Sequence, residues 1–122
     1  MTPKQAFRLV AHALPIALKN PRSKKHVSII LKKNEIVSTG VNRTKTHPLA
    51  KRYGYYFDEV HSELDALLRY KGMKDGLTLV NFRFNRFGEM RKSRPCRLCV
   101  PWCISVFDHI YYTTNEELKR LK

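Results

Sequence analysis

The chain has 122 residues, 43% of them hydrophobic, which is enough to fill the core of one compact domain. Its formal net charge is +14, from 24 lysines and arginines against 10 acids, so polyanions are the first partners to consider. The composition excludes a membrane-spanning protein, because no apolar run approaches the ~20 residues that a span needs, and we expect no membrane partner.

The chain start and the cysteine content together indicate the compartment. The first residues lack the long apolar stretch and the small-residue cleavage site of a signal peptide. The three cysteines are an odd number and too few for a disulfide framework. We therefore expect a cytoplasmic, intracellular protein, in which the C-x-x-C spacing of Cys96 and Cys99 indicates metal or redox chemistry.

Basic residues are concentrated in two regions of the chain. Residues 1–52 hold twelve basic residues and one acid, and residues 83–97 hold six basic residues and one acid. Such a field attracts a nucleic acid or another phosphate-bearing partner, although a solvated surface tuned for solubility is the alternative. The candidates for phosphate or nucleic-acid contacts are Lys24, Lys25, Arg43, Lys45, Arg52, Arg91 and Arg94.

No repeat or linker interrupts the chain, so we predict a single domain over residues 1–122. Apolar residues at helical spacing predict a helix over 3–19, which Pro15 should kink or divide. Alternating apolar residues predict a hairpin over 26–41 with its turn at Lys33-Asn34. Apolar residues on both sides of these strands indicate a sheet that helices cover on each face.

The second half alternates helices and strands. The pattern predicts a basic loop over 42–55, a helix over 57–71 that Gly72 ends, and a strand over 77–84. A helix should run from Pro95 to about Phe107, with a bend at Pro101. A short strand over 110–113 and a final helix over 116–122, capped by Asn115, complete the prediction. This alternation predicts an α/β layered sheet.

Two short motifs carry the chemistry. His61-Ser62-Glu63 lies near the start of one predicted helix, and Pro95-Cys96-Arg97-Leu98-Cys99 starts another. One imidazole and two thiolates supply three ligands to Zn²⁺ and leave the fourth tetrahedral position for water. Glu63, two residues after the histidine, can approach that water without binding the metal and can take its proton. We therefore predict a zinc site at His61, Cys96 and Cys99, with Glu63 as the catalytic residue.

The pair of motifs, H-x-E followed by P-C-x-x-C, is the signature of the zinc base deaminases. The sequence resembles the cytidine and deoxycytidylate deaminase superfamily from about Pro3 to Thr114, and the resemblance includes Gly40-Val41-Asn42 and Ser93-Arg94-Pro95-Cys96. It implies a three-layer α-β-α sheet, here with a short or missing fifth strand because few residues follow Thr114. It also implies substrate contacts from Asn42, Thr44, His47 and Ser93, and it leaves a homo-oligomer open.

The resemblance implies hydrolytic deamination of a cytosine base to uracil, and adenine presents the same amidine pattern. The charge slightly favours a base within single-stranded DNA or RNA, because a strand rewards a continuous basic track. A free nucleotide of the deoxycytidylate or cytidine type is the alternative substrate. A further alternative is a non-catalytic nucleic-acid-binding module with a structural zinc, which would need a fourth protein ligand such as Cys103.

Each residue also has a plainer interpretation. Cys96 and Cys99 could form a redox pair, although that would not explain the H-x-E motif. Cys103 could instead be a small buried hydrophobe. Glu63 could be a surface carboxylate on an exposed helix edge, and Asn42 could be a simple turn residue.

Overall fold

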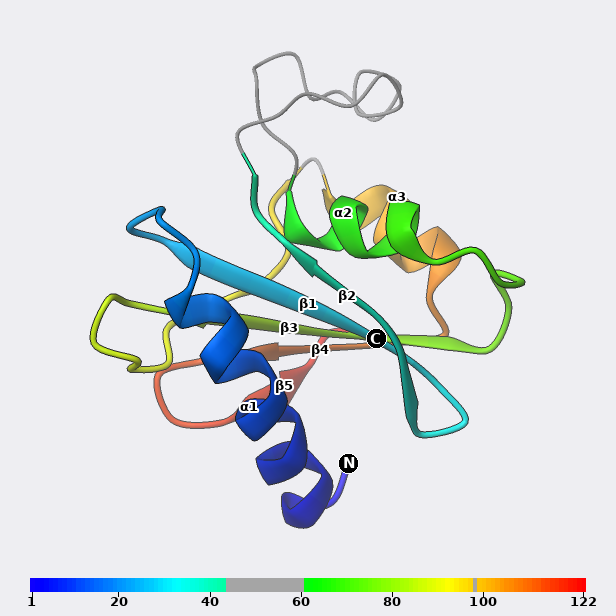
Figure 1. Ribbon diagram of the computed structural model, residues 1–122. Coiled ribbons are helices and arrows are strands. Elements are labelled where there is room, and N and C mark those ends of the chain that lie inside the picture. The colour runs from blue at the N-terminus through cyan, green and yellow to red at the C-terminus, as the bar shows by residue number, and fades with distance from the viewer. Residues whose placement is uncertain (44–60, 98) are drawn as a thin grey trace.

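The computed structural model describes residues 1–43, 61–97 and 99–122 (Figure 1). Its strands form one mixed sheet in the order β2-β1-β3-β4-β5, in which β3 and β4 are parallel and the other neighbours are antiparallel. The elements in chain order are α1 Pro3–Leu18, β1 Lys25–Lys32, β2 Glu35–Val41, α2 Ser62–Arg69, β3 Leu77–Phe84, α3 Cys99–Val106, β4 His109–Thr113 and β5 Leu118–Arg120.

Helices cover both faces of the sheet (Figure 1). On one face, α1 buries Leu9 and Ala13 against a cluster that includes Ile29 of β1 and Phe82 of β3. On the other face, α2 and α3 pack on a second cluster, whose members include Ile30, Leu64, Leu79, Cys103 and Ile110. Successive residues of a strand point to opposite faces, so β1 and β3 need apolar side chains on both. The predicted three-layer α/β arrangement is confirmed.

The β1–β2 hairpin turns at Lys33 and Asn34, as the sequence predicts. Both residues have positive φ angles, 51° and 65°, which is the backbone of a two-residue turn whose twist matches that of the flanking strands. The turn places β2 beside β1, and the pairing of the two strands begins at Lys32 and Glu35. This hairpin carries the chain to Asn42, at the end of the sheet where the candidate site lies.

Gly40 allows β2 to approach α2 closely. A Cβ atom at this position would lie 2.2 Å from the backbone nitrogen of Ala66 and 2.5 Å from the carbonyl oxygen of Ser62. Backbone atoms cannot retreat cheaply, so the contact requires glycine. Ser38, two residues earlier, donates a hydrogen bond of 2.7 Å to the Ala66 carbonyl. The close approach at Gly40 places the first turn of α2, and with it His61 and Glu63, over the end of β2, whereas the Ser38 hydrogen bond meets the helix one turn later.

Three helices differ from the sequence prediction. The helix predicted over 57–71 runs from Ser62 to Arg69 in the described part of the chain, with His61 as its N-cap residue. The first helix runs without division from Pro3 to Leu18, with Pro15 inside it. Pro15 lacks the N–H that would normally donate a hydrogen bond to the carbonyl of Ala11, four residues earlier. Both residues are exposed, so water can hydrate that carbonyl instead. The helix predicted from Pro95 begins instead at Cys99. Pro101 thus lies in the first turn, where its missing N–H costs no helical hydrogen bond.

The predicted C-terminal helix over 116–122 is wrong. Residues Leu118–Arg120 form β5, which pairs antiparallel with Thr113 to Tyr111 of β4. A seven-residue helix is marginal in isolation, whereas the open edge of β4 offers unpaired backbone groups to an extended segment. The expected short fifth strand is therefore present, three residues long. No helix in the described part of the chain is long and apolar enough to cross a membrane.

Candidate metal centre and active site

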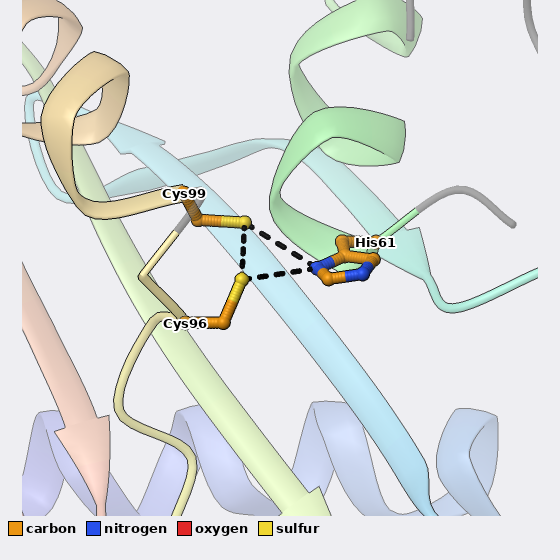
Figure 2. A group of neighbouring side chains, drawn as sticks. All are labelled: His61, Cys96 and Cys99. Carbon is orange, nitrogen blue, oxygen red and sulfur yellow. Dashed lines mark hydrogen bonds between the residues drawn. The ribbon is translucent and has the colours of Figure 1, made fainter. Parts of the chain in front are cut away.

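Three potential metal ligands meet at the ends of two helices. His61 is the N-cap residue of α2, Cys99 is the first residue of α3, and Cys96 lies three residues earlier. The two Sγ atoms are 3.5 Å apart, and they lie 3.4 Å (Cys96) and 3.5 Å (Cys99) from Nδ1 of His61 (Figure 2). Among the described residues, these side chains form the one histidine, cysteine and carboxylate group that is close enough to hold a metal ion.

The distances fit a tetrahedral zinc ion. Bonds of about 2.3 Å to sulfur and about 2.05 Å to nitrogen place two sulfurs about 3.8 Å apart, and a sulfur and a nitrogen about 3.6 Å apart. The observed separations of 3.4 to 3.5 Å lie within a few tenths of an ångström of these values. The donor set of one imidazole and two thiolates is also one that zinc favours. The cluster is therefore consistent with a metal ion held by three protein ligands.

Local backbone hydrogen bonds bring the two cysteines together. The carbonyl of Cys96 accepts from the backbone nitrogens of Cys99 at 3.0 Å and Val100 at 2.9 Å, which forms the turn that opens α3. The hydrogen bond from Cys99, followed by that from His61, lowers the pKa of the Cys96 thiol to about 3 against the opposing effect of burial. The thiolate is the form that binds metal, so the neighbours of Cys96 favour ligation.

Cys103 is not part of this group. Its side chain is completely buried in the cluster beneath α2 and α3, near Leu64 and Phe107. Burial raises the pKa of the Cys103 thiol, and the nearby charges of Glu63 and Cys96 raise it further. A thiol that resists ionisation in an apolar core matches the small buried hydrophobe of the alternative interpretation. The described residues thus supply no fourth ligand of the kind that a structural zinc module would need.

Glu63 lies in the first turn of α2 and lines the same cavity as His61 and Cys96. The residue is only 5% exposed, so it is not a carboxylate on an exposed helix edge. One of its oxygens, Oε1, accepts a hydrogen bond of 2.9 Å from the hydroxyl of Ser62. A buried carboxylate that borders a cavity beside potential metal ligands is suitably placed to exchange a proton there.

The cavity has a volume of about 370 Å³ and a strongly cationic wall. Arg22, Lys24, Arg43 and Arg94 line it, together with His26. The pKa of His26 is lowered to about 4, chiefly by burial and then by the nearby charges of Arg83 and His61, so its ring is neutral at pH 7. The site therefore combines a neutral imidazole with several permanent cations, which suits a ligand that carries a polar ring and an anionic group.

Asn42 and Ser93 line the cavity, as expected for substrate contacts, but their side chains also bind their own chain. The Oδ1 atom of Asn42 accepts from Nδ2 of Asn20 at 2.8 Å and from the His26 backbone nitrogen at 3.0 Å, which is more than a simple turn residue does. The Ser93 hydroxyl donates to the Asn81 carbonyl at 2.8 Å. Both residues therefore shape the wall. The other expected contacts, Thr44 and His47, lie outside the described residues.

The basic candidates divide into three groups. Lys24, Arg43 and Arg94 line the cavity. Two candidates lie elsewhere. Lys25 is 8% exposed, and its amine donates to the carbonyls of Asn20 and Arg22. Arg91 donates to the Met90 carbonyl and forms an ion pair with Glu89. Lysine ammonium groups that satisfy buried carbonyls are not available to a phosphate, so the expectation for Lys25 is corrected. Lys45 and Arg52 lie outside the described residues.

Sequence reasoning missed two residues of the cavity wall. His26 is the half-buried second residue of β1, in a segment whose sequence pattern indicates only a strand. Arg22 lies in the segment that ends the first helix, and it is one of 24 lysines and arginines in the chain. No local pattern distinguishes either residue from other basic residues, because only the folded sheet brings both into the cavity wall that contains His61.

The fold is similar to that of a solved deaminase. No protein-family model matches this chain, and no curated protein matches its sequence. Among solved structures, the chain is similar to the crystal structure of dCMP deaminase from the cyanophage S-TIM5 in apo form, with a TM-score of 0.65. The match covers 96% of this chain and 88% of that chain at 19% sequence identity. The chain therefore has the cytidine deaminase-like fold with a His/Cys/Cys triad, as the resemblance in its two motifs predicts.

Proposed function

We propose that the protein is a zinc-dependent hydrolase that deaminates the cytosine base of a free nucleotide. The observation that carries this proposal is the group of His61, Cys96 and Cys99 at one wall of a cavity that Glu63 also lines. A three-ligand donor set leaves one position of a tetrahedral ion open, as catalytic rather than structural zinc sites do. The similarity to a dCMP deaminase fold supports the same reaction class.

In the proposed mechanism, His61, Cys96 and Cys99 would hold the ion. Zinc bound there would lower the pKa of water toward ~7 and so supply a nucleophile at neutral pH. Glu63 accepts the proton of the attacking water and passes it to N3 of the cytosine ring. The same carboxylate then takes the remaining proton from the hydroxyl group added at C4 and passes it to the departing amino group, so that the products are the uracil base and ammonia.

The cavity supports a free nucleotide over a nucleic-acid strand. Arg22, Lys24, Arg43 and Arg94 surround one cavity of about 370 Å³, and a single phosphate needs only one or two of these cations. The solved structure of similar fold is named for a free nucleotide, dCMP. The sequence alone slightly favours a strand, and the formal net charge of +14 keeps a cytosine within single-stranded DNA or RNA as the second candidate.

A substrate panel tests the proposal. Zinc-loaded protein is incubated side by side with deoxycytidylate, deoxycytidine, cytidine, single-stranded and double-stranded oligonucleotides, and uracil formation is measured. We expect the highest kcat/KM for deoxycytidylate. If only single-stranded oligonucleotides are deaminated, with a rate that falls steeply between low and moderate salt, the substrate is a cytosine within a strand and not a free nucleotide. A protein that contains one zinc per chain and deaminates none of these substrates would contradict the proposal.

A further inference from the structure

A chain of buried polar side chains runs from Glu63 into the centre of the sheet. Ser62 donates from Oγ to Oε1 of Glu63 at 2.9 Å. The Ser28 hydroxyl of β1 lies 2.8 Å from that of Ser62 and 2.7 Å from Oδ1 of Asn81 on β3. Ser28 is completely buried, and Ser62 and Asn81 are each 2% exposed. The carboxylate is thus tied to the two central strands through side chains that are almost completely buried.

Ser28 and Asn81 are unusual residues for their position. They face each other in register on β1 and β3, between the completely buried neighbours Val27 and Ile29 on one strand and Val80 and Phe82 on the other. Polar groups in an apolar layer cost free energy unless they hydrogen-bond, and an apolar pair would pack there without that cost. The polar pair shares the face of Ile30 and Leu79, which is covered by α2 and α3. It therefore lies beneath the turn that carries Glu63.

The Ser62 hydroxyl is held between the carboxylate and the sheet. Each serine hydroxyl carries one proton and can also accept a hydrogen bond. The Ser62 hydroxyl donates its proton to Oε1 of Glu63, and its oxygen lies 2.8 Å from the hydroxyl of Ser28, which can donate to it. Ser28 therefore fixes the position of the Ser62 hydroxyl from the side of the sheet.

We propose that Ser62, backed by Ser28, is a positioning residue that holds Oε1 of Glu63 and leaves the other carboxylate oxygen to exchange protons in the cavity. This inference rests on the proposed deaminase function. The first turn of a helix restrains the Glu63 backbone, and the hydroxyl pair restrains the carboxylate end of the side chain. Both restraints reduce the motion of a group that must meet a reacting atom within hydrogen-bond distance.

Two hydroxyl deletions and a matched control test the inference with the zinc-loaded, full-length protein. We expect Ser62→Ala and Ser28→Ala each to lower kcat for the best substrate of the panel roughly ten-fold, with KM and zinc content unchanged. Ser38→Ala is the control, because it also deletes a serine hydroxyl that hydrogen-bonds α2, through the Ala66 carbonyl at 2.7 Å. It should lower stability and leave kcat unchanged.

A double-mutant cycle tests whether Ser62 acts on turnover through the Glu63 carboxyl group. In the background of Glu63→Gln, deletion of the Ser62 hydroxyl should cause no further loss in residual kcat, because Ser62 acts through the carboxyl group. An unchanged kcat in Ser62→Ala, or equal losses in Ser62→Ala and Ser38→Ala, would overturn the positioning role.

A measurement without turnover separates this inference from the proposed function. The ¹³C resonance of the Glu63 side-chain carboxyl should shift in Ser62→Ala and in Ser28→Ala, and stay in place in Ser38→Ala. If the wild-type protein deaminates no substrate but the resonance shifts, the proposed function fails while the contact between Ser62 and Glu63 stands. A resonance that does not respond to the loss of the Ser62 hydroxyl overturns the inference whatever the activity is.

Discussion

The guanidinium of Arg43 lies 2.6 Å from the carboxylate of Asp65, whose side chain is completely buried. The same carboxylate accepts from the Val41 backbone nitrogen at 3.0 Å and from Nε of Arg69, also at 3.0 Å. Asp65 thus joins the end of β2 to α2 and holds Arg43 at the cavity wall. One buried acid therefore connects the stability of the fold with the electrostatics of the site.

Replacement of Asp65 by asparagine should destabilise the protein by about 2 to 4 kcal/mol, because two arginines lose their buried anionic partner. Urea unfolding of the zinc-loaded protein measures the change. The control is Asp75→Asn, which removes an ion pair with Lys32 whose side chains are 73% and 29% exposed. That pair should contribute far less to stability, because water screens charges that are exposed to it. Equal effects of the two substitutions would contradict the role assigned to Asp65.

Cys99→Ser should lose bound zinc, and Cys103→Ala should retain it. The Sγ atom of Cys99 lies 3.5 Å from both Sγ of Cys96 and Nδ1 of His61, whereas Cys103 is a buried residue outside this group. Metal content per chain, measured by elemental analysis after dialysis, distinguishes the two. Removal of zinc with a chelator should also lower Tm, since an ion that binds only the folded state stabilises it. A Cys99→Ser protein with one zinc per chain would remove Cys99 from the ligand set.

Glu63→Gln should retain zinc and fold while its kcat falls by about 10² to 10⁴, the usual contribution of a positioned acid or base. The amide has nearly the shape of the carboxyl group but cannot accept and return a proton. Circular dichroism and metal analysis serve as controls for folding and zinc content. Turnover near the wild-type rate would show that another group carries the proton.

The cationic wall predicts a phosphate-dependent effect. Arg94→Ala and Lys24→Ala should each raise KM for deoxycytidylate several-fold and leave KM for deoxycytidine nearly unchanged, because only the nucleotide carries the anionic group. Arg91→Ala is the matched control, since Arg91 pairs with Glu89 away from the cavity. A parallel rise in KM for both substrates would indicate that these side chains act on the base or on the fold.

His26 should make stability depend on pH. Its pKa is lowered from 6.5 to about 4 in the folded chain, chiefly by burial. Between these values the unfolded chain binds a proton that the folded chain excludes, so the free energy of unfolding falls as pH decreases from about 6.5 toward about 4. We expect this contribution to reach about 2 kcal/mol by pH 5. Urea unfolding of wild type and His26→Gln at pH 7 and pH 5 checks it, and a stability difference independent of pH would contradict it.

Elements whose signal is local could be predicted from the amino-acid sequence. Alternating apolar residues located β1, β2 and β3, and Lys33-Asn34 identified the turn between the first two. The spacing of His61, Cys96 and Cys99 identified the potential ligands, because each motif lies within a few residues at the start of a helix. Short-range spacing decides such features, so they can be inferred without the fold.

Tertiary structure decided what depends on neighbours distant in the chain. The segment after Thr113 became β5 because β4 offered an open edge, which outweighs the weak helical preference of a short segment. The Lys25 amine is turned toward carbonyls of its own loop, whereas Arg22, three residues earlier, and His26, one residue later, reach the cavity. Ser28 and Asn81, 53 residues apart, met beneath Glu63 through the register of β1 and β3. Strand register and burial are set by the packing of the whole sheet, and they determine which of many similar residues touch the site.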